Sequence, residues 1–210
     1  MEIEMSVAQR ERAALIAALR DVGPDAPTLC EGWTARDLAA HLMVREYRVD
    51  AAPGILIPLF AGHTAKVQDA VANNTQWDAL VEKVAEGPPI YSPLKLVDSV
   101  ANVAEMFIHH EDIRRAQPGW EPRTLDAELT GKLRRTLGMM ARLTLAKMPA
   151  RVQLRTPDGK TVLTAGHGPA VTVTGPPEEL LLFATGRPAH VDFSGDPSDV
   201  QAVKAAPKGL

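Results

Sequence analysis

Apolar residues recur at helical spacing along most of the chain up to Pro149. Glycine and proline punctuate this spacing, as at Gly23–Pro24, and mark where helices end. The third helical stretch follows Pro53 and Pro58, and its irregular start predicts a lid or a broken helix. The whole pattern predicts helices over residues 4–22, 35–49, 61–85, 94–116 and 125–148. Long helices joined by short connections favour an antiparallel bundle.

The second helix has a recognisable start. Thr34 precedes it and Asp37 follows three residues later, which approximates a capping box. The acidic side chain also suits the positive end of the helix dipole. This start places His41 nearly two turns into the helix, where Leu38 and Leu42 flank it, so we expect its imidazole to face the bundle interior.

Beyond Pro149 the period changes from helical to alternating, which predicts a small sheet. The alternating apolar positions are Val152, Leu154, Val162, Val171 and Val173. Residues 175–187 then place proline at a helix start and glycine at its end, and a strand and a short C-terminal helix follow. We therefore predict two domains, a helical bundle over 1–149 and a small α+β domain over 150–210, in a mainly α fold.

Composition narrows the classes of partner. The chain has 210 residues and a formal net charge of −3, so it offers no strong basic field and we expect no nucleic-acid partner. It has no apolar stretch near the roughly 20 residues of a membrane span, and its charged start is unlike a secretory signal. We expect a cytoplasmic protein without a membrane partner. Because Cys30 is its single cysteine, any metal must be held mainly by histidine and carboxylate.

The helix over 94–116 carries the candidate chemistry. Residues four apart share a helix face, so Glu105 and His109 are placed to bind one ion. Asp98 and Asp112 fall on roughly the same side, whereas His110 points away. A hydrogen-bonded Glu–His pair on a helix flank would give the same pattern without any metal.

A third donor changes this balance. A lone interior histidine is usually a core residue, but His41 facing Glu105 and His109 would complete a set of two imidazoles and one carboxylate. Three protein ligands leave one position open for water or substrate, which is the pattern of catalytic rather than structural zinc. The same set suits non-haem iron, so the donors alone leave the metal open.

At these residues the sequence resembles a known family. The string LCEGWTARDLAAHL (29–42) is similar to the N-terminal signature of the mycothiol-dependent maleylpyruvate isomerase metal-binding domain, a DinB-like helical family. AEMFIHHEDIRRA (104–116) resembles its second signature, and GPPEELLLFATGR (175–187) with FSGDPSDV (193–200) resembles its small second domain. The resemblance implies a bacterial protein with a DinB-like antiparallel four-helix bundle and a small C-terminal α+β domain.

The same resemblance implies His41, Glu105 and His109 as ligands of one divalent metal, with zinc expected first and nickel, iron or manganese as alternatives. It also implies mycothiol or another low-molecular-weight thiol as cofactor. We therefore expect a metal-dependent thiol S-transferase or isomerase that acts on a small molecule, as a monomer or homodimer. Asp112 is expected to orient His109, or to be a plain structural acid, and Arg45 to hold an anionic group, or to pair with a nearby acid.

Two further hypotheses stay open. A non-catalytic metal module, structural or sensing, would fill the fourth position with Cys30, Asp112 or His110. A metal-free helical interaction domain would keep His41 far from Glu105.

Overall fold

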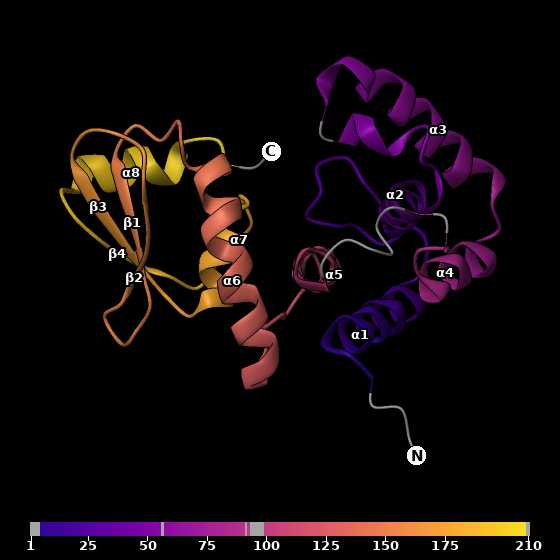
Figure 1. Ribbon diagram of the computed structural model, residues 1–210, viewed down its shortest axis with the longest axis horizontal. Helices are drawn as coiled ribbons and strands as arrows, with labels where there is room; N and C mark the ends of the chain where they lie inside the picture. Colours follow the sequence, from indigo (N-terminus) through magenta and orange to yellow (C-terminus); the bar gives the residue numbers. More distant parts are fainter. Residues whose placement is uncertain (1–4, 56, 91, 93–98, 209–210) are drawn as a thin grey trace. The chain divides into compact units, whose positions relative to one another are not determined.

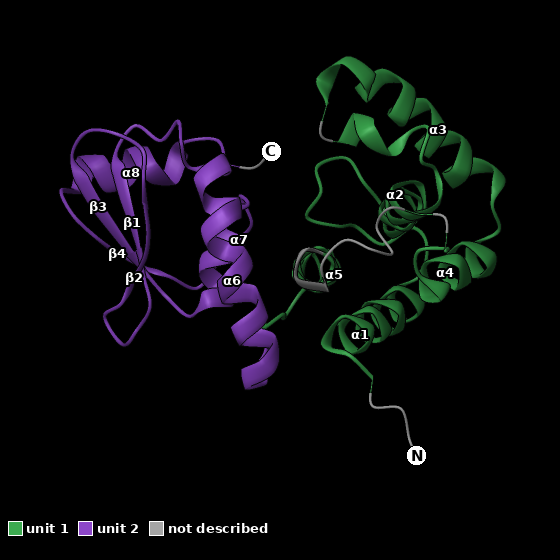
Figure 2. Ribbon diagram, viewed as in Figure 1, with its two compact units in different colours: residues 1–121 green, residues 122–210 purple. Residues whose placement is uncertain are grey.

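The computed structural model describes residues 5–55, 57–90, 92 and 99–208, and for 99–101 the backbone only. It divides into two compact units, Met1–Glu121 and Pro122–Leu210 (Figure 2). The division differs from the boundary expected after residue 149. The reason is α6 (Ala127–Thr144), whose apolar face packs on a helix and a strand that come later in the chain.

The first unit is helical. Its helices are α1 (Val7–Val22), α2 (Ala35–Tyr47), α3 (Ala61–Asn74), α4 (Trp77–Glu86) and α5 (Ser99–Arg114), with 3-10 turns η1 (Ala52–Ile55) and η2 (Pro58–Phe60) before α3. The start expected for α5 at Leu94, together with Asp98, lies outside the described residues.

The start of α2 forms as predicted. The Thr34 hydroxyl accepts a hydrogen bond from the Asp37 backbone N–H, and the Asp37 carboxylate accepts one from the Thr34 backbone N–H. This capping box satisfies two backbone donors that a helix end leaves open. It therefore fixes where α2 begins and which face presents His41.

The stretch over 61–85, for which the sequence left a broken helix open, forms two helices. Thr75 takes an extended conformation, with φ −107° and ψ 129°, and Gln76 begins α4 from the same region. The break thus falls in the middle of the stretch, and the irregular part before it is the pair of 3-10 turns around Pro53 and Pro58. The break lets the apolar faces of α3 and α4 pack separately on α2.

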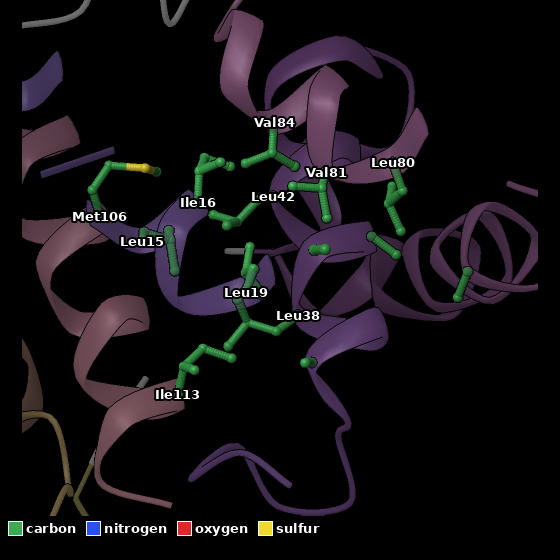
Figure 3. Close-up of a cluster of buried hydrophobic side chains, with 14 residues drawn as sticks. Leu15, Ile16, Leu19, Leu38, Leu42, Leu80, Val81, Val84, Met106 and Ile113 are labelled. Atoms are coloured by element: carbon green, nitrogen blue, oxygen red, sulfur yellow. The ribbon is translucent and has the colours of Figure 1, made fainter. Parts of the chain in front are cut away.

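A cluster of buried hydrophobic side chains (Figure 3) draws on all five helices, with Ala72 as the contribution of α3. Leu15 and Leu19 of α1, Leu38 and Leu42 of α2, Leu80 of α4, and Met106 and Ile113 of α5 are each fully buried. Figure 1 shows α1, α2, α4 and α5 close to one another within the first unit, where α1 contacts α2, α4 and α5, and α2 contacts α4. Each such side chain contributes about 1.5–3 kcal/mol when removed from water, so the cluster holds α2 and α5 in a fixed relation.

The second unit is α+β. Its strands are β1 (Arg151–Arg155), β2 (Thr161–Ala165), β3 (Ala170–Thr174) and β4 (Asp192–Ser194), in the order β2-β1-β3-β4, and its helices are α6, α7 (Pro177–Ala184) and α8 (Pro197–Ala205). β1 pairs with β2 in antiparallel and with β3 in parallel register. Val152, Leu154, Val171 and Val173 are buried as predicted, but on β2 Leu163 rather than Val162 is buried.

α6 and α7 pack on each other, α6 also contacts β2, and α8 contacts β3. The observed architecture confirms the predicted fold class, mainly α with a small α+β part. Within the described ranges every helix is too short or too polar to cross a lipid bilayer.

Candidate metal centre

His41 is buried in the first unit, with 8% of its surface exposed. The centre of its ring lies 5.1 Å from that of Trp33 and 5.3 Å from that of His109 on α5. Trp33 is the residue immediately before the capping box. The helix start at Thr34 and the apolar neighbours of His41 together hold the imidazole against α5.

Glu105 and His109 meet His41 across the two helices. Glu105 Oε1 lies 3.3 Å from His109 Nε2 and 3.6 Å from His41 Nε2. One carboxylate oxygen is therefore shared between the imidazoles. This proximity contradicts the metal-free hypothesis, which required His41 to lie far from Glu105.

The three side chains fit a divalent ion. Each offers one ligand atom, and these atoms all lie within 4.8 Å of one another. Bonds of about 2.0–2.2 Å in tetrahedral geometry put neighbouring ligand atoms roughly 3.4 Å apart. The two measured separations, 3.3 and 3.6 Å, lie close to that spacing, so an ion needs little rearrangement of these residues.

Charges are strongly coupled here. Burial lowers the pKa of His41, so its imidazole favours the neutral form that a metal requires. Burial also opposes ionisation of Glu105, but hydrogen bonds with His109 and His41 outweigh it and hold the pKa of Glu105 well below its ordinary value. Burial disfavours charged His109 too, yet its bonds to Asp112, Cys30 and Glu105 raise its pKa well above its ordinary value.

Asp112 lies behind His109. Its Oδ2 atom is 2.9 Å from His109 Nδ1 and 3.2 Å from the Cys30 thiol, which donates to it. Asp112 itself is fully buried. A carboxylate on Nδ1 keeps a proton there and leaves the Nε2 lone pair for a metal, which is the usual support of a metal-bound histidine.

Arg45 lies beside the shared carboxylate, one turn after His41. Its Nε atom is 3.2 Å from Glu105 Oε1, and its terminal nitrogens are 3.3 and 3.4 Å from Asn102 Oδ1. Sequence reasoning missed Asn102. A signal existed, because Asn102 stands three residues before Glu105 and thus on the same helix face.

His110 takes no part in this set. It points to α1, where its Nδ1 atom lies 2.9 Å from Glu11 Oε1. The predicted separation of the two neighbouring histidines is therefore confirmed.

A cavity of about 290 Å³ adjoins His41 in the same unit. Trp33 and His41 line one side and residues of η1 and α3 line the other. Trp33 thus presents its indole ring as part of this wall. The sequence did not reveal the cavity, since it depends on how α3 lies against α2.

Comparisons with known proteins agree with this reading of the fold. A family model described as the mycothiol maleylpyruvate isomerase N-terminal domain matches residues 6–173. Two solved structures are similar over 90% of this chain and 90% of theirs, each at 17% sequence identity. They are the crystal structure of the mycothiol-dependent maleylpyruvate isomerase, with a TM-score of 0.54, and that of a histidine-to-alanine mutant of it, with a TM-score of 0.57.

No curated protein matches the sequence. At such low identity the solved structures support the fold alone. The family model spans the first unit from residue 6 onward, including His41, Glu105 and His109, and continues into the sheet of the second. The chain therefore belongs to the mycothiol maleylpyruvate isomerase N-terminal domain family.

Proposed function

We propose that this protein is a metal-dependent enzyme that uses mycothiol, or a similar low-molecular-weight thiol, to isomerise a small molecule or transfer a sulfur substituent. The observation that carries the proposal is the convergence of His41, Glu105 and His109, whose ligand atoms all lie within 4.8 Å of one another. The family match supports the same thiol chemistry, and the two similar isomerase structures support the fold.

The donor set supports catalysis more than a closed structural site. In the described part of the chain, His41, Glu105 and His109 form a set of three with no fourth histidine, cysteine or acid. Three protein ligands leave a position for an exogenous ligand. When bound there, a divalent ion would lower the pKa of a coordinated thiol, so that the thiol reacts as thiolate at neutral pH.

The protein's own residues then have distinct tasks. Asp112 holds the proton on His109 Nδ1 and keeps the ring oriented toward Glu105. Arg45 neutralises Glu105 and is half-buried, so its guanidinium is placed to hold a carboxylate on a substrate near the donors. We propose Arg45 as the residue that binds the anionic group of the substrate.

A non-catalytic metal module is the second candidate, and one observation favours it. Cys30, His109 and Asp112 also place three ligand atoms within 4.8 Å of one another. The two sets share His109. An ion held mainly by Cys30 and Asp112 would be enclosed by protein, and thus structural, rather than open to a substrate.

The test is metal analysis of untagged full-length protein after dialysis against a weak chelator. We expect about one equivalent of zinc in the parent, a loss of metal in His41→Ala and Glu105→Ala, and retention in the matched control His110→Ala. Loss in Cys30→Ala but not in His41→Ala would instead assign the ion to the second set.

Thiol use is tested on protein reloaded with cobalt(II). Added mycothiol should produce a thiolate-to-metal absorption band in the parent and none in Glu105→Ala. Metal retention without such a band, with mycothiol or glutathione, would support the non-catalytic module.

A further inference from the structure

Among the described residues that line the cavity beside His41, one buried polar side chain has no hydrogen-bond partner in the protein. Gln68, on the buried face of α3, lines the cavity and is 8% exposed. Its side-chain amide makes no hydrogen bond to the part of the chain that the structure describes. The amide is not sealed from the cavity, so a ligand seated there can replace water as its hydrogen-bond partner.

The rest of the wall defines what this ligand must be. Thr64 is also buried, and the single proton of its hydroxyl is already directed at the Ala51 and Phe60 carbonyls, so toward a ligand this hydroxyl can only accept a hydrogen bond. Trp33 supplies an aromatic face, and exposed Asp69 supplies a negative charge. The described lining holds no lysine or arginine, so an anionic ligand finds no counter-charge there.

This contrasts with Arg45, whose guanidinium lies near the same donors but not in the cavity wall. His41 belongs to both regions, since it lines the cavity and approaches Glu105. A molecule seated in the cavity therefore has its reactive end next to the metal donors, while a substrate carboxylate has a separate place at Arg45.

We propose that this cavity binds the neutral, hydrogen-bonding portion of the thiol cofactor, with Gln68 as its specificity-determining residue. The proposal rests on the proposed function, because it assumes that a thiol approaches His41. Mycothiol suits the lining chemically, since it is an uncharged cysteinyl sugar conjugate rich in amide and hydroxyl groups. The volume, about 290 Å³, accommodates part of such a molecule, and small-molecule pockets usually begin near this size.

The test separates the cavity from the metal by using S-methylmycothiol, which has no thiol to ionise. Calorimetric titration of the zinc-loaded full chain should show binding to the parent and about tenfold weaker binding to Gln68→Leu. Gln76→Leu is the matched control, because Gln76 is exposed and makes no side-chain cap on α4. Its affinity should equal that of the parent.

Two checks keep the result interpretable. The cobalt(II) spectrum of Gln68→Leu should match the parent spectrum, which shows that the fold and the metal donors are intact. S-methylglutathione, which carries a net negative charge, should bind the parent at least about tenfold more weakly than S-methylmycothiol, and Asp69→Asn should narrow that difference.

Each outcome bears separately on the two proposals. If S-methylmycothiol binds parent and Gln68→Leu equally while mycothiol still gives the cobalt–thiolate band, the cavity proposal is overturned and the proposed function stands. If binding depends on Gln68 but no band forms, the cavity proposal stands and thiolate chemistry at the metal fails. Absence of both overturns both.

Discussion

His109 and His110 are neighbours on α5, nearly equally buried, yet they lie in two different environments. His110 faces α1 and meets one carboxylate, with its Nδ1 atom 2.9 Å from Glu11 Oε1. His109 faces α2 and meets two carboxylates on opposite ring nitrogens, Asp112 on Nδ1 and Glu105 on Nε2. Only on the α2 side does a second imidazole, His41, join the group.

The difference between His110 and the proposed ligand His109 shows that burial beside an acid does not by itself identify a metal ligand. The Glu11–His110 contact joins α1 to α5 through one carboxylate and one imidazole. On the other face, His41 and His109 both direct Nε2 at one carboxylate oxygen, which cannot satisfy the whole group as well as a shared cation can.

The largest expected effect concerns Glu11 and His110, where α5 packs against α1. Glu11→Ala leaves His110 buried without its partner, so we expect a loss of about 2–3 kcal/mol in the free energy of unfolding. Denaturant unfolding of the metal-free protein measures it. Zinc content should stay near one equivalent, because His109 and its partners are untouched.

The control for that loss replaces both partners by apolar residues. Glu11→Leu combined with His110→Leu should recover most of the stability, since replacing both partners of a buried hydrogen bond by apolar side chains is often nearly neutral. Loss of metal from folded Glu11→Ala protein would show that the two faces of α5 are not independent.

The sequence predicts much of this site because helices make it local. Spacing of four placed Glu105 and His109 on one face, and the Thr34–Asp37 capping box fixed the start of α2 and the orientation of His41. The family resemblance, and not the periodicity, predicted that His41 of α2 lies opposite Glu105 and His109 of α5. The ligand role of the three residues stays a proposal.

Other features could not be predicted because they depend on packing between distant segments. The polarity of Gln68 on the buried face of α3 was visible, but the cavity in front of it required the positions of η1 and α2. Likewise α6 has a helical pattern that fits either unit, and only its packing on α7 and β2 places it in the second.

The next effect concerns the residue behind His109. Asp112→Asn keeps the shape but removes the negative charge that holds the Nδ1 proton, so zinc affinity should fall by about 10- to 100-fold. Competition with a fluorescent zinc chelator measures the change. Glu11→Gln, the equivalent change behind His110, should leave zinc affinity unaltered, and an equal loss in both would place the two histidines in one coupled network.

A smaller effect is the dependence on pH. The pKa of His109 is raised above 6.5, so its contribution to stability is complete below pH 6.5 and is lost as the pH rises through its folded-state pKa. The lowered pKa of His41 changes the free energy of unfolding only below pH 6.5, and the lowered pKa of Glu105 changes it only below pH 4.5. Metal-free protein should therefore become less stable above pH 6.5, by up to about 1.4 kcal/mol per pH unit.

Zinc reverses this slope, because the ion competes with the proton for His109. Its apparent affinity should rise over the same pH range. Denaturant unfolding with and without zinc provides the measurement, and His109→Gln should flatten the slope of the metal-free protein. A metal-free protein that instead gains stability with pH would show that His109 is neutral in the fold.

The smallest expected effect is a gain in zinc affinity, whereas the change at Asp112 is expected to lower it. Arg45 competes with a metal for Glu105 Oε1, 3.2 Å away, and its positive charge repels a cation bound there. A partly exposed ion pair contributes about 0.2–1 kcal/mol, so Arg45→Met should tighten zinc binding by roughly two- to fivefold. Arg48→Met is the matched control, because Arg48 pairs with Asp50 at the surface and should change nothing. Weaker zinc binding in Arg45→Met would mean that Arg45 mainly orients Glu105 for the metal. The position of the carboxylate would then depend on a side chain of α2 as well as on α5, which carries Glu105.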